Sequence, residues 1–241
     1  MNQFKKLNNY IGWIVFLIAS FVYLSTIEQT VSFWDCGEYI STAYKLEVGH
    51  PPGAPFFQLF GRIFTLFATQ GTSEVAIAIN IMSALCSSFT ILFLFWTITA
   101  FGRKLFLNNK EDYDFGKIIA VIGSGIVGAL AYTFSDSFWF SAVEGEVYAM
   151  SSLFTAVTFW CIMKWEEESD KPHSSRWLVL IGYLIGLSIG VHLLSLLTIP
   201  AMGMIYYFKK YNYTKAGAIK AFIASVMILG VVQGIIIPGA V

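Results

Sequence analysis

Residues 75–102 read VAIAINIMSALCSSFTILFLFWTITAFG and contain no Asp, Glu, Lys or Arg. A helix that crosses a membrane needs about 20 mostly apolar residues, with roughly 17 as the minimum. Five other charge-free stretches reach that length: 7–27, 118–135, 147–163, 177–208 and 221–241. These runs are continuous rather than alternating, which excludes a membrane β-barrel. We therefore predict an all-α, polytopic membrane protein.

The composition of the whole chain supports this class. Of 241 residues, 56% are apolar and 12% are charged, against about 25% charged in an ordinary soluble domain. The formal net charge is zero. The sequence has no stripe of basic and aromatic residues on one side, so nothing indicates nucleic-acid binding. The three cysteines are scattered, which indicates neither a disulfide framework nor a metal cluster. We treat 1–241 as a single transmembrane module and expect it to be the N-terminal part of a larger protein.

The stretch 177–208 is too long for one crossing. As a single helix it would extend about 48 Å, whereas the hydrocarbon core is roughly 30 Å thick. Gly186, Gly190 and His192 lie near its middle and predict a fold-back there. Two short tilted spans and a re-entrant hairpin are both compatible with this length. With the fold-back, the chain has about seven hydrophobic helical segments.

The distribution of Lys and Arg predicts the orientation. If the N-terminus with Lys5 and Lys6 is cytoplasmic, 13 of the 15 Lys and Arg residues fall in cytoplasmic segments, as the positive-inside rule requires. Only Lys45 and Arg62 lie on the other side. Residues 28–74 and 136–146 are then extracytoplasmic. The first run lacks a small-x-small cleavage site, so we expect it to remain as an anchor.

The first outer loop, 28–74, has the pattern of interfacial helices. Its apolar side chains recur at helical spacing, and its polar ones occupy another face. Such helices lie in the membrane interface, and Trp34 suits the headgroup layer. Anchoring alone would account for the aromatic residues. The apolar set is Phe56, Phe60, Ile63, Phe64 and Phe67, and the polar set is Gln58, Arg62 and Thr65.

The same loop contains the best candidates for catalysis. Asp35 and Glu38 are three residues apart, so both carboxylates would share one helix face. His50, Pro51 and Pro52 follow, and prolines fix the backbone in a way that can aim His50 at a site. A carboxylate that is partly desolvated at a bilayer surface can act as a general base. The alternatives are that Asp35 caps the helix after it and that His50 is an ordinary turn histidine.

The second outer loop adds Glu144, Glu146 and Tyr148. An acid at the start of a helix is stabilised by the helix dipole, which accounts for Glu146. An acid-x-acid pair could also hold a divalent cation through its oxygens, although two carboxylates do not define a metal site. His192, at the predicted fold-back, would lie at the same outer side of the membrane. It would either contact substrate or be a buried histidine bonded to a backbone carbonyl.

Four of these segments together resemble a known family. They are Trp34-Asp35-x-Gly37-Glu38-Tyr39, Gly49-His50-Pro51-Pro52-Gly53-x-Pro55, Gly145-Glu146-Val147-Tyr148-Ala149 and Gly190-Val191-His192-Leu193-Leu194. In order and spacing they resemble a family of bacterial membrane proteins of unknown function. That family is related to the transmembrane protein O-mannosyltransferases, which are GT-C glycosyltransferases. In the last segment Val191 replaces an expected Asn.

The resemblance implies an inverting transferase that moves a sugar, mannose for example, from a polyprenyl-phosphate donor to a hydroxyl of an extracytoplasmic protein or other acceptor. It implies Asp35 as the base with Glu38 beside it, in a bacterial inner membrane. The departing phosphate would be assisted by Arg62 or by a divalent metal. The predicted substrate-binding residues are Trp34, His50, Pro51, Pro52, Arg62, Glu144, Glu146, Tyr148 and His192. A transporter and a non-catalytic assembly subunit are the rival classes.

Overall fold

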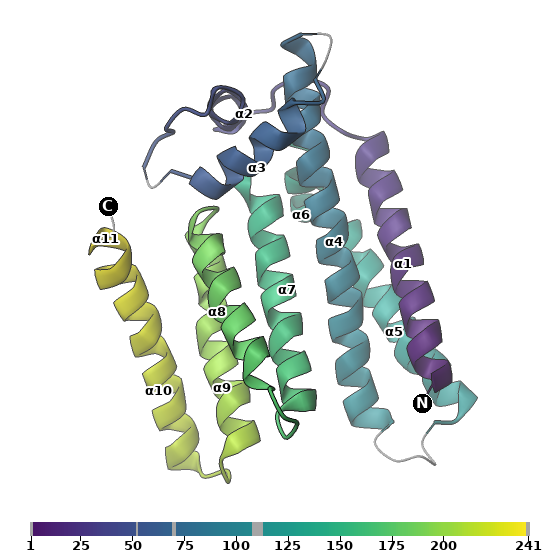
Figure 1. The fold of residues 1–241 in the computed structure, drawn as a ribbon. Helices are drawn as coiled ribbons and strands as arrows, with labels where there is room; N and C mark the ends of the chain where they lie inside the picture. The colour runs from purple at the N-terminus through teal and green to yellow at the C-terminus, as the bar shows by residue number, and fades with distance from the viewer. Residues whose placement is uncertain (1, 52, 69–70, 108–112, 240–241) are drawn as a thin grey trace.

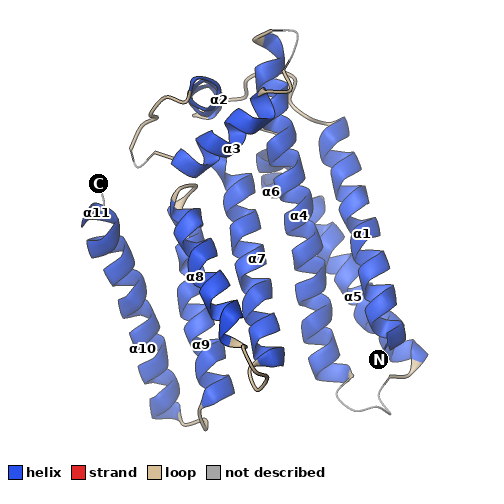
Figure 2. Cartoon of the chain, viewed as in Figure 1, coloured by secondary structure: helices blue, strands red, loops and turns tan. Residues whose placement is uncertain are grey.

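The computed structural model describes residues 2–51, 53–68, 71–107 and 113–239, and within them every regular element is helical (Figure 2). In this described part of the chain, five helices are long and apolar enough to cross a membrane, so the chain is a multi-pass membrane protein. They include α1 (Asn2–Ser25), α4 (Ser73–Phe106), α5 (Phe115–Thr133) and α7 (Val147–Glu168). The fifth runs through α10 (Lys215–Val231), η3 (Val232–Ile236) and α11 (Ile237–Gly239).

Helix α4 is the central element and packs against α1, α5 and α7 (Figure 1). Its 34 residues extend about 51 Å at 1.5 Å per residue, so it reaches beyond the hydrocarbon layer. Its small and hydroxylated residues allow close packing, as is usual between membrane helices. At Gly125 of α5, for example, an added Cβ would lie 2.5 Å from Thr99 of α4.

The stretch 177–208 folds back as predicted. Helix α8 (Ser175–Ile189) ends at Gly190, and the short 3₁₀ helix η2 (Leu193–Leu197) leads into α9 (Thr198–Lys210). The turn between α8 and η2, which contains His192, lies at the same end of the bundle as α2 (Cys36–Lys45) and α3 (Pro55–Thr65) (Figure 1). With 15 and 13 residues, the two arms extend only about 20 Å each. They form a short hairpin, so seven full-length spans are not confirmed.

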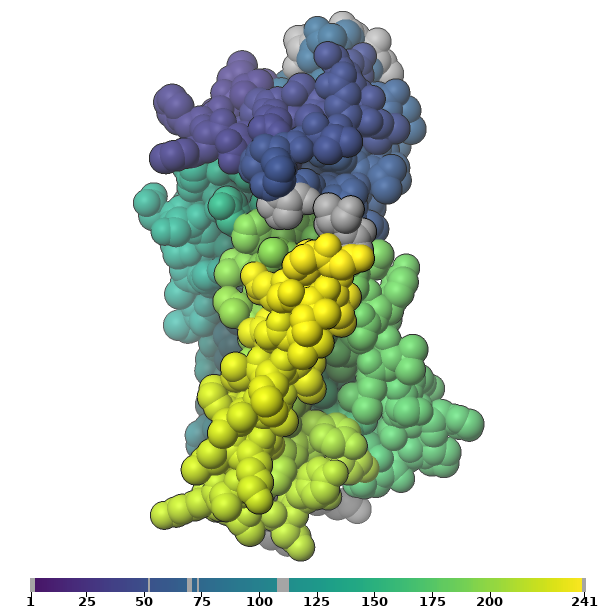
Figure 3. Space-filling view, turned by 90° about the vertical axis from the view of Figure 1, so that its left-hand side faces the viewer, coloured from purple at the N-terminus to yellow at the C-terminus, as the bar shows by residue number. Residues whose placement is uncertain are grey.

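The loop 28–74 covers one end of the bundle (Figures 1 and 3). It folds into α2 (Cys36–Lys45) and α3 (Pro55–Thr65), and the short α6 (Asp136–Ala142) lies at the same end. Helix α3 is amphipathic, as expected, but its polar Gln58 and Thr65 are buried while Phe60 and Ile63 are exposed. An outward apolar face is what a helix beside lipid requires.

Helix α10 lies on the outside of the bundle, where it packs against α9 (Figures 1 and 3). The segments that connect α1 to α4, α5 to α7 and α8 to α9 gather at one end, which we call the loop end. The start of α1 and the ends of α4, α7 and α9 lie at the other, which we call the opposite end (Figure 1).

Candidate functional site

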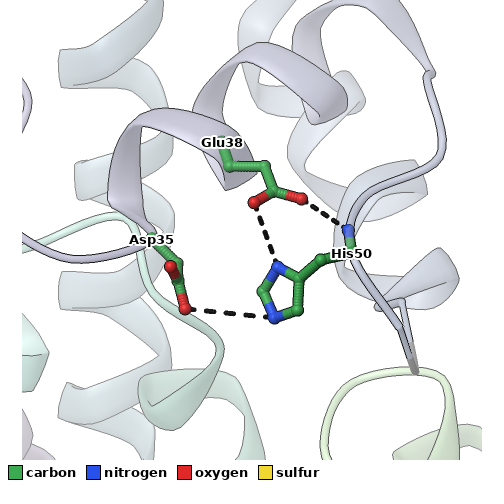
Figure 4. Close-up of side chains that lie close together, drawn as sticks. All are labelled: Asp35, Glu38 and His50. Carbon is green, nitrogen blue, oxygen red and sulfur yellow. Dashed lines mark hydrogen bonds and ion pairs between the residues drawn. The ribbon is translucent and has the colours of Figure 1, made fainter.

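Asp35 occupies the N-cap position of α2, but its side chain makes no capping hydrogen bond. The capping role that the sequence left open is therefore not how this carboxylate is used. The side chain is 58% exposed and points to His50, with 3.9 Å between Asp35 Oδ2 and His50 Nε2 (Figure 4). Asp35 thus has a carboxylate that is accessible from outside and faces a single basic group.

Glu38 fixes His50 by two contacts (Figure 4). The backbone N–H of His50 donates to Glu38 Oε1 at 2.5 Å, and its Nδ1 lies 3.0 Å from Glu38 Oε2. The bonds from His50 lower the pKa of Glu38, and in turn Glu38 raises the pKa of His50. The imidazole is therefore held with Nε2 toward Asp35 and is biased toward its charged form.

A tight turn brings His50 to this position. Gly53, in the left-handed region at φ +71°, donates its N–H to the His50 carbonyl at 2.8 Å. At Gly49 an added Cβ would lie 3.0 Å from Glu38 Oε1, so the close approach favours glycine. Pro51 is exposed in the turn, and Pro52 lies outside the described residues.

Beneath this group, Glu144 and Glu146 are buried, with 4% and 5% of their surface exposed. Glu146 accepts from the Val147 N–H at 3.3 Å and from the Cys36 thiol at 3.8 Å. Burial raises the pKa of Glu144, and burial together with the Glu144 charge raises the pKa of Glu146 to about 7. The helix-start role predicted for Glu146 is present. Burial nevertheless raises the pKa of Glu146 more than the hydrogen bond from Val147 lowers it.

Three separate segments meet around these acids. Tyr39 lies 5.9 Å from the His50 ring, measured between ring centroids. Burial and the charges of Glu146, Asp35 and Glu38 raise the pKa of Tyr39 to about 12. The Phe56 N–H donates to the Gly190 carbonyl at 2.7 Å, which joins the α8–η2 turn to α3. The loop end is therefore one assembled site built from the first loop, the second loop and the hairpin turn.

Tyr148 and His192 form a pair at the edge of this site, with ring centroids 5.3 Å apart. His192 Nδ1 accepts from the Leu194 N–H at 3.1 Å, which leaves Nε2 as the protonated nitrogen of the neutral ring. Burial lowers the pKa of His192. Its bond to the backbone is of the kind that the structural alternative predicted, although the partner is an N–H rather than a carbonyl. Its contact with Tyr148 places it beside the predicted site.

Two other predicted binding residues make no hydrogen bond or ion pair with these acids in the described part of the chain. Arg62 donates to the Tyr44 carbonyl at 2.8 Å and stacks over the Tyr44 ring. Trp34 has a left-handed backbone at φ +61° and is 88% exposed. An exposed indole at this end is suited to the membrane interface.

Asp35, Glu38 and His50 each offer one potential metal-ligand atom, a carboxylate oxygen or a ring nitrogen, and these atoms all lie within 4.8 Å of one another. Two carboxylates and an imidazole are ligands that divalent transition metals accept. The three residues therefore fit a cation. The Glu144 and Glu146 pair suggested by the sequence also lies together, buried beside Cys36.

The sequence pattern did not identify Cys36, Tyr39 or Asn80 as part of the site. Asn80 of α4 donates to the Glu28 and Thr30 carbonyls at 2.7 and 3.1 Å, which fixes the start of the loop. The one signal available was Asn80 itself, an amide within an otherwise mostly apolar run. Polar residues are costly in membranes and usually have a structural or functional role.

The fold and the site define a helical membrane protein with an acid and histidine group at one end of its spans. The chain belongs to the family of the protein O-mannosyl-transferase TMEM260 N-terminal domain, whose model matches residues 35–215. That range includes every predicted site residue except Trp34.

Two relatives have the same name. Protein O-mannosyl-transferase tmem260 of Dictyostelium discoideum is 28% identical over 197 residues, which cover 78% of this chain and 22% of that protein. Protein O-mannosyl-transferase TMEM260 of Mus musculus is 25% identical over 176 residues, which cover 73% of this chain and 22% of that protein. The chain thus spans about a fifth of the length of these relatives. No solved structure matches it.

Proposed function

We propose that this chain carries the catalytic site of a protein O-mannosyltransferase, which moves mannose from a polyprenyl-phosphate donor to a hydroxyl of an acceptor protein. The names of its relatives support the mannosyl group and the protein acceptor. The observation that carries the proposal is the environment of Asp35. Its carboxylate is accessible, makes no capping bond and faces a histidine held by Glu38.

In this mechanism Asp35 is the general base. The acceptor hydroxyl attacks the anomeric carbon of the donor, its proton passes to the Asp35 carboxylate, and the bond from that carbon to the phosphate oxygen breaks. The products are an inverted glycoside and a free polyprenyl phosphate. Glu38 acts as a positioning residue because it fixes the ring of His50.

The leaving phosphate gains negative charge, which a nearby cation stabilises. Arg62 was one candidate, but its guanidinium contacts Tyr44 and Thr65. His50 is better placed because it lies beside Asp35 and Glu38 raises its pKa. A divalent cation held by Asp35, Glu38 and His50 would supply the same stabilisation.

A cavity within the bundle fits the lipid part of the donor. It has a volume of about 800 Å³ and lies between α4, α5, α7 and the η2–α9 segment. Its lining begins near the site, with Ser151 one turn after Tyr148 and Leu194 two residues after His192. A largely apolar space that starts below the acids allows an isoprenoid chain to stay in the membrane while its phosphate reaches the surface.

We place the site on the extracytoplasmic side of the membrane because the cations gather at the opposite end. A cysteine introduced at the exposed Val48 should then react with an impermeant thiol reagent in intact cells. The bacterial inner membrane stays a prediction from the resemblance, since the two relatives come from Dictyostelium and mouse.

The test is transfer of labelled mannose from polyprenyl-phosphate mannose to an acceptor protein by the purified full-length protein in detergent. We expect product that depends on the donor. A transporter would instead show uptake of substrate into vesicles, and a non-catalytic subunit would show neither activity. Uptake without transfer, or neither activity in a folded preparation, would contradict the proposal.

A further inference from the structure

A second cavity lies at the opposite end of the bundle, far along the helices from the acids. It has a volume of about 730 Å³ and is lined by residues of α1, α4, α7 and the turn after α7. Helix α4 lies between α1 and α7 (Figure 1), so α4 forms the floor of a groove whose walls are the other two helices. Neither the sequence motifs nor the proposed reaction uses this groove.

Among the described residues that line the groove, four are cations and two are carboxylates. Glu167 is shared by Arg103 and Lys164, and Glu168 is shared by Lys171 and Arg176. Lys5, which is exposed, also lines the groove and has no ion pair among the described residues. The groove therefore presents a net positive charge that an anion can neutralise.

The deeper part of the groove is aromatic. Trp96 lies 6.3 Å from Trp13 and 6.1 Å from Trp160, measured between ring centroids. Trp13 is eight residues beyond Lys5 on α1, which is about 12 Å along the helix axis. The groove thus passes from a charged mouth to an aromatic interior over about 12 Å along α1.

We propose that this groove binds the headgroup and upper acyl chains of an anionic phospholipid from the membrane leaflet at the opposite end. The phosphate would lie among Lys5, Arg103 and Lys171, and the acyl chains would pass along Trp13 and Trp160. A small phosphate ion would use only the charged part of the groove and would leave the tryptophan wall uncovered. The inference is independent of the proposed transferase activity.

The experiment measures lipid binding by the purified full-length protein with native mass spectrometry, using phosphatidylglycerol and phosphatidylcholine at equal concentration. We expect preferential retention of phosphatidylglycerol. The double substitution Lys5→Gln and Lys171→Gln should weaken that retention about 10-fold or more, since each basic residue near a charged membrane surface contributes about 1 kcal/mol. The matched control, Lys209→Gln with Lys215→Gln, removes two cations of the same end that do not line the groove, and should retain the lipid.

Equal retention of the two lipids by the wild type would overturn the proposal. So would unchanged phosphatidylglycerol retention in a Lys5 and Lys171 double variant that elutes normally in size exclusion. Competition by millimolar inorganic phosphate separates a lipid from a free anion, because loss of the lipid at that concentration would identify a simple anion site. If the double variant does not fold, Trp13→Leu supplies a second test, with weaker lipid retention expected.

Discussion

The two ends of the helical bundle differ in how their charges are arranged. At the opposite end Glu166, Glu167, Glu168 and Asp170 are each paired with a Lys or Arg. At the loop end none of Asp35, Glu38, Glu144 and Glu146 pairs with a Lys or Arg in the described residues. His50 is the basic partner of Asp35 and Glu38. Paired charges at a membrane surface serve the fold and the orientation. Unpaired and partly buried acids lower stability, which is typical of a functional site.

If the loop end is the functional end, replacement of Asp35 should have the largest effect on mannose transfer. Asp35→Asn keeps the size of the side chain but cannot accept a proton, so turnover in the mannose-transfer assay should fall about 10²-fold or more. Asp136→Asn is the matched control, because Asp136 is an exposed acid at the same end of the bundle and should leave turnover unchanged. Near-normal turnover in a folded Asp35→Asn variant would remove Asp35 as the base.

Replacement of Glu38 should have a smaller effect and should change the pH profile. Glu38→Gln should lower turnover about 10-fold, because the ring of His50 loses its anchor. Glu38 raises the pKa of His50, so the loss of activity on the alkaline side should begin at lower pH in the variant. Glu47→Gln, which changes a loop acid paired with Lys45, should leave the profile in place. An unshifted alkaline limb in Glu38→Gln would show that protonated His50 is not needed.

Glu146 should make stability depend on pH. Its pKa is raised from 4.5 to about 7, so the folded state binds more protons than the unfolded state between these values, and stability falls as pH rises through that range. The loss is on the order of 3 kcal/mol. In Glu146→Gln the amide oxygen can still accept from Val147, and this decline between pH 5 and pH 8 should shrink. Unfolding in a denaturing detergent at the two pH values measures it, and an equally steep decline in the variant would contradict the assignment.

The smallest effect should come from the opposite end. Lys209 pairs with Asp170 at 3.4 Å, and the Asp170 side chain is 80% exposed. Exposed pairs contribute about 1 kcal/mol or less. Lys209→Gln should therefore lower the midpoint of thermal unfolding by only a few degrees and leave mannose transfer unchanged. A large loss of transfer would show that the two ends are not functionally separate.

The sequence predicted the helices well because charge-free runs of this length have few alternatives in a membrane. It also predicted the turn at Gly190 to His192, where length alone required a fold-back. The sequence could not predict which face of α3 is buried. Periodicity identifies an apolar face, but it does not say whether that face contacts protein or lipid. Here Gln58 faces inward and Phe60 faces outward.

The candidate site was predicted in part. Asp35, Glu38 and His50 are close in sequence, and a helix followed by a stiff turn can bring them together. The burial of Glu144 and Glu146 against Cys36 depends on contact between segments about 110 residues apart, which local pattern does not reveal. For the same reason the sequence did not show that Arg62 would bind the Tyr44 carbonyl.

The most direct test of the account is a structure of the protein with a polyprenyl-phosphate mannose analogue bound. The account predicts phosphate density beside His50, the sugar between His50 and Asp35, and the isoprenoid chain in the cavity lined by Thr90, Ser151 and Leu194. Density for the mannosyl group of the analogue at the opposite end, among Arg103 and Lys171, would contradict it, because the donor would then lie far from every acid assigned to catalysis.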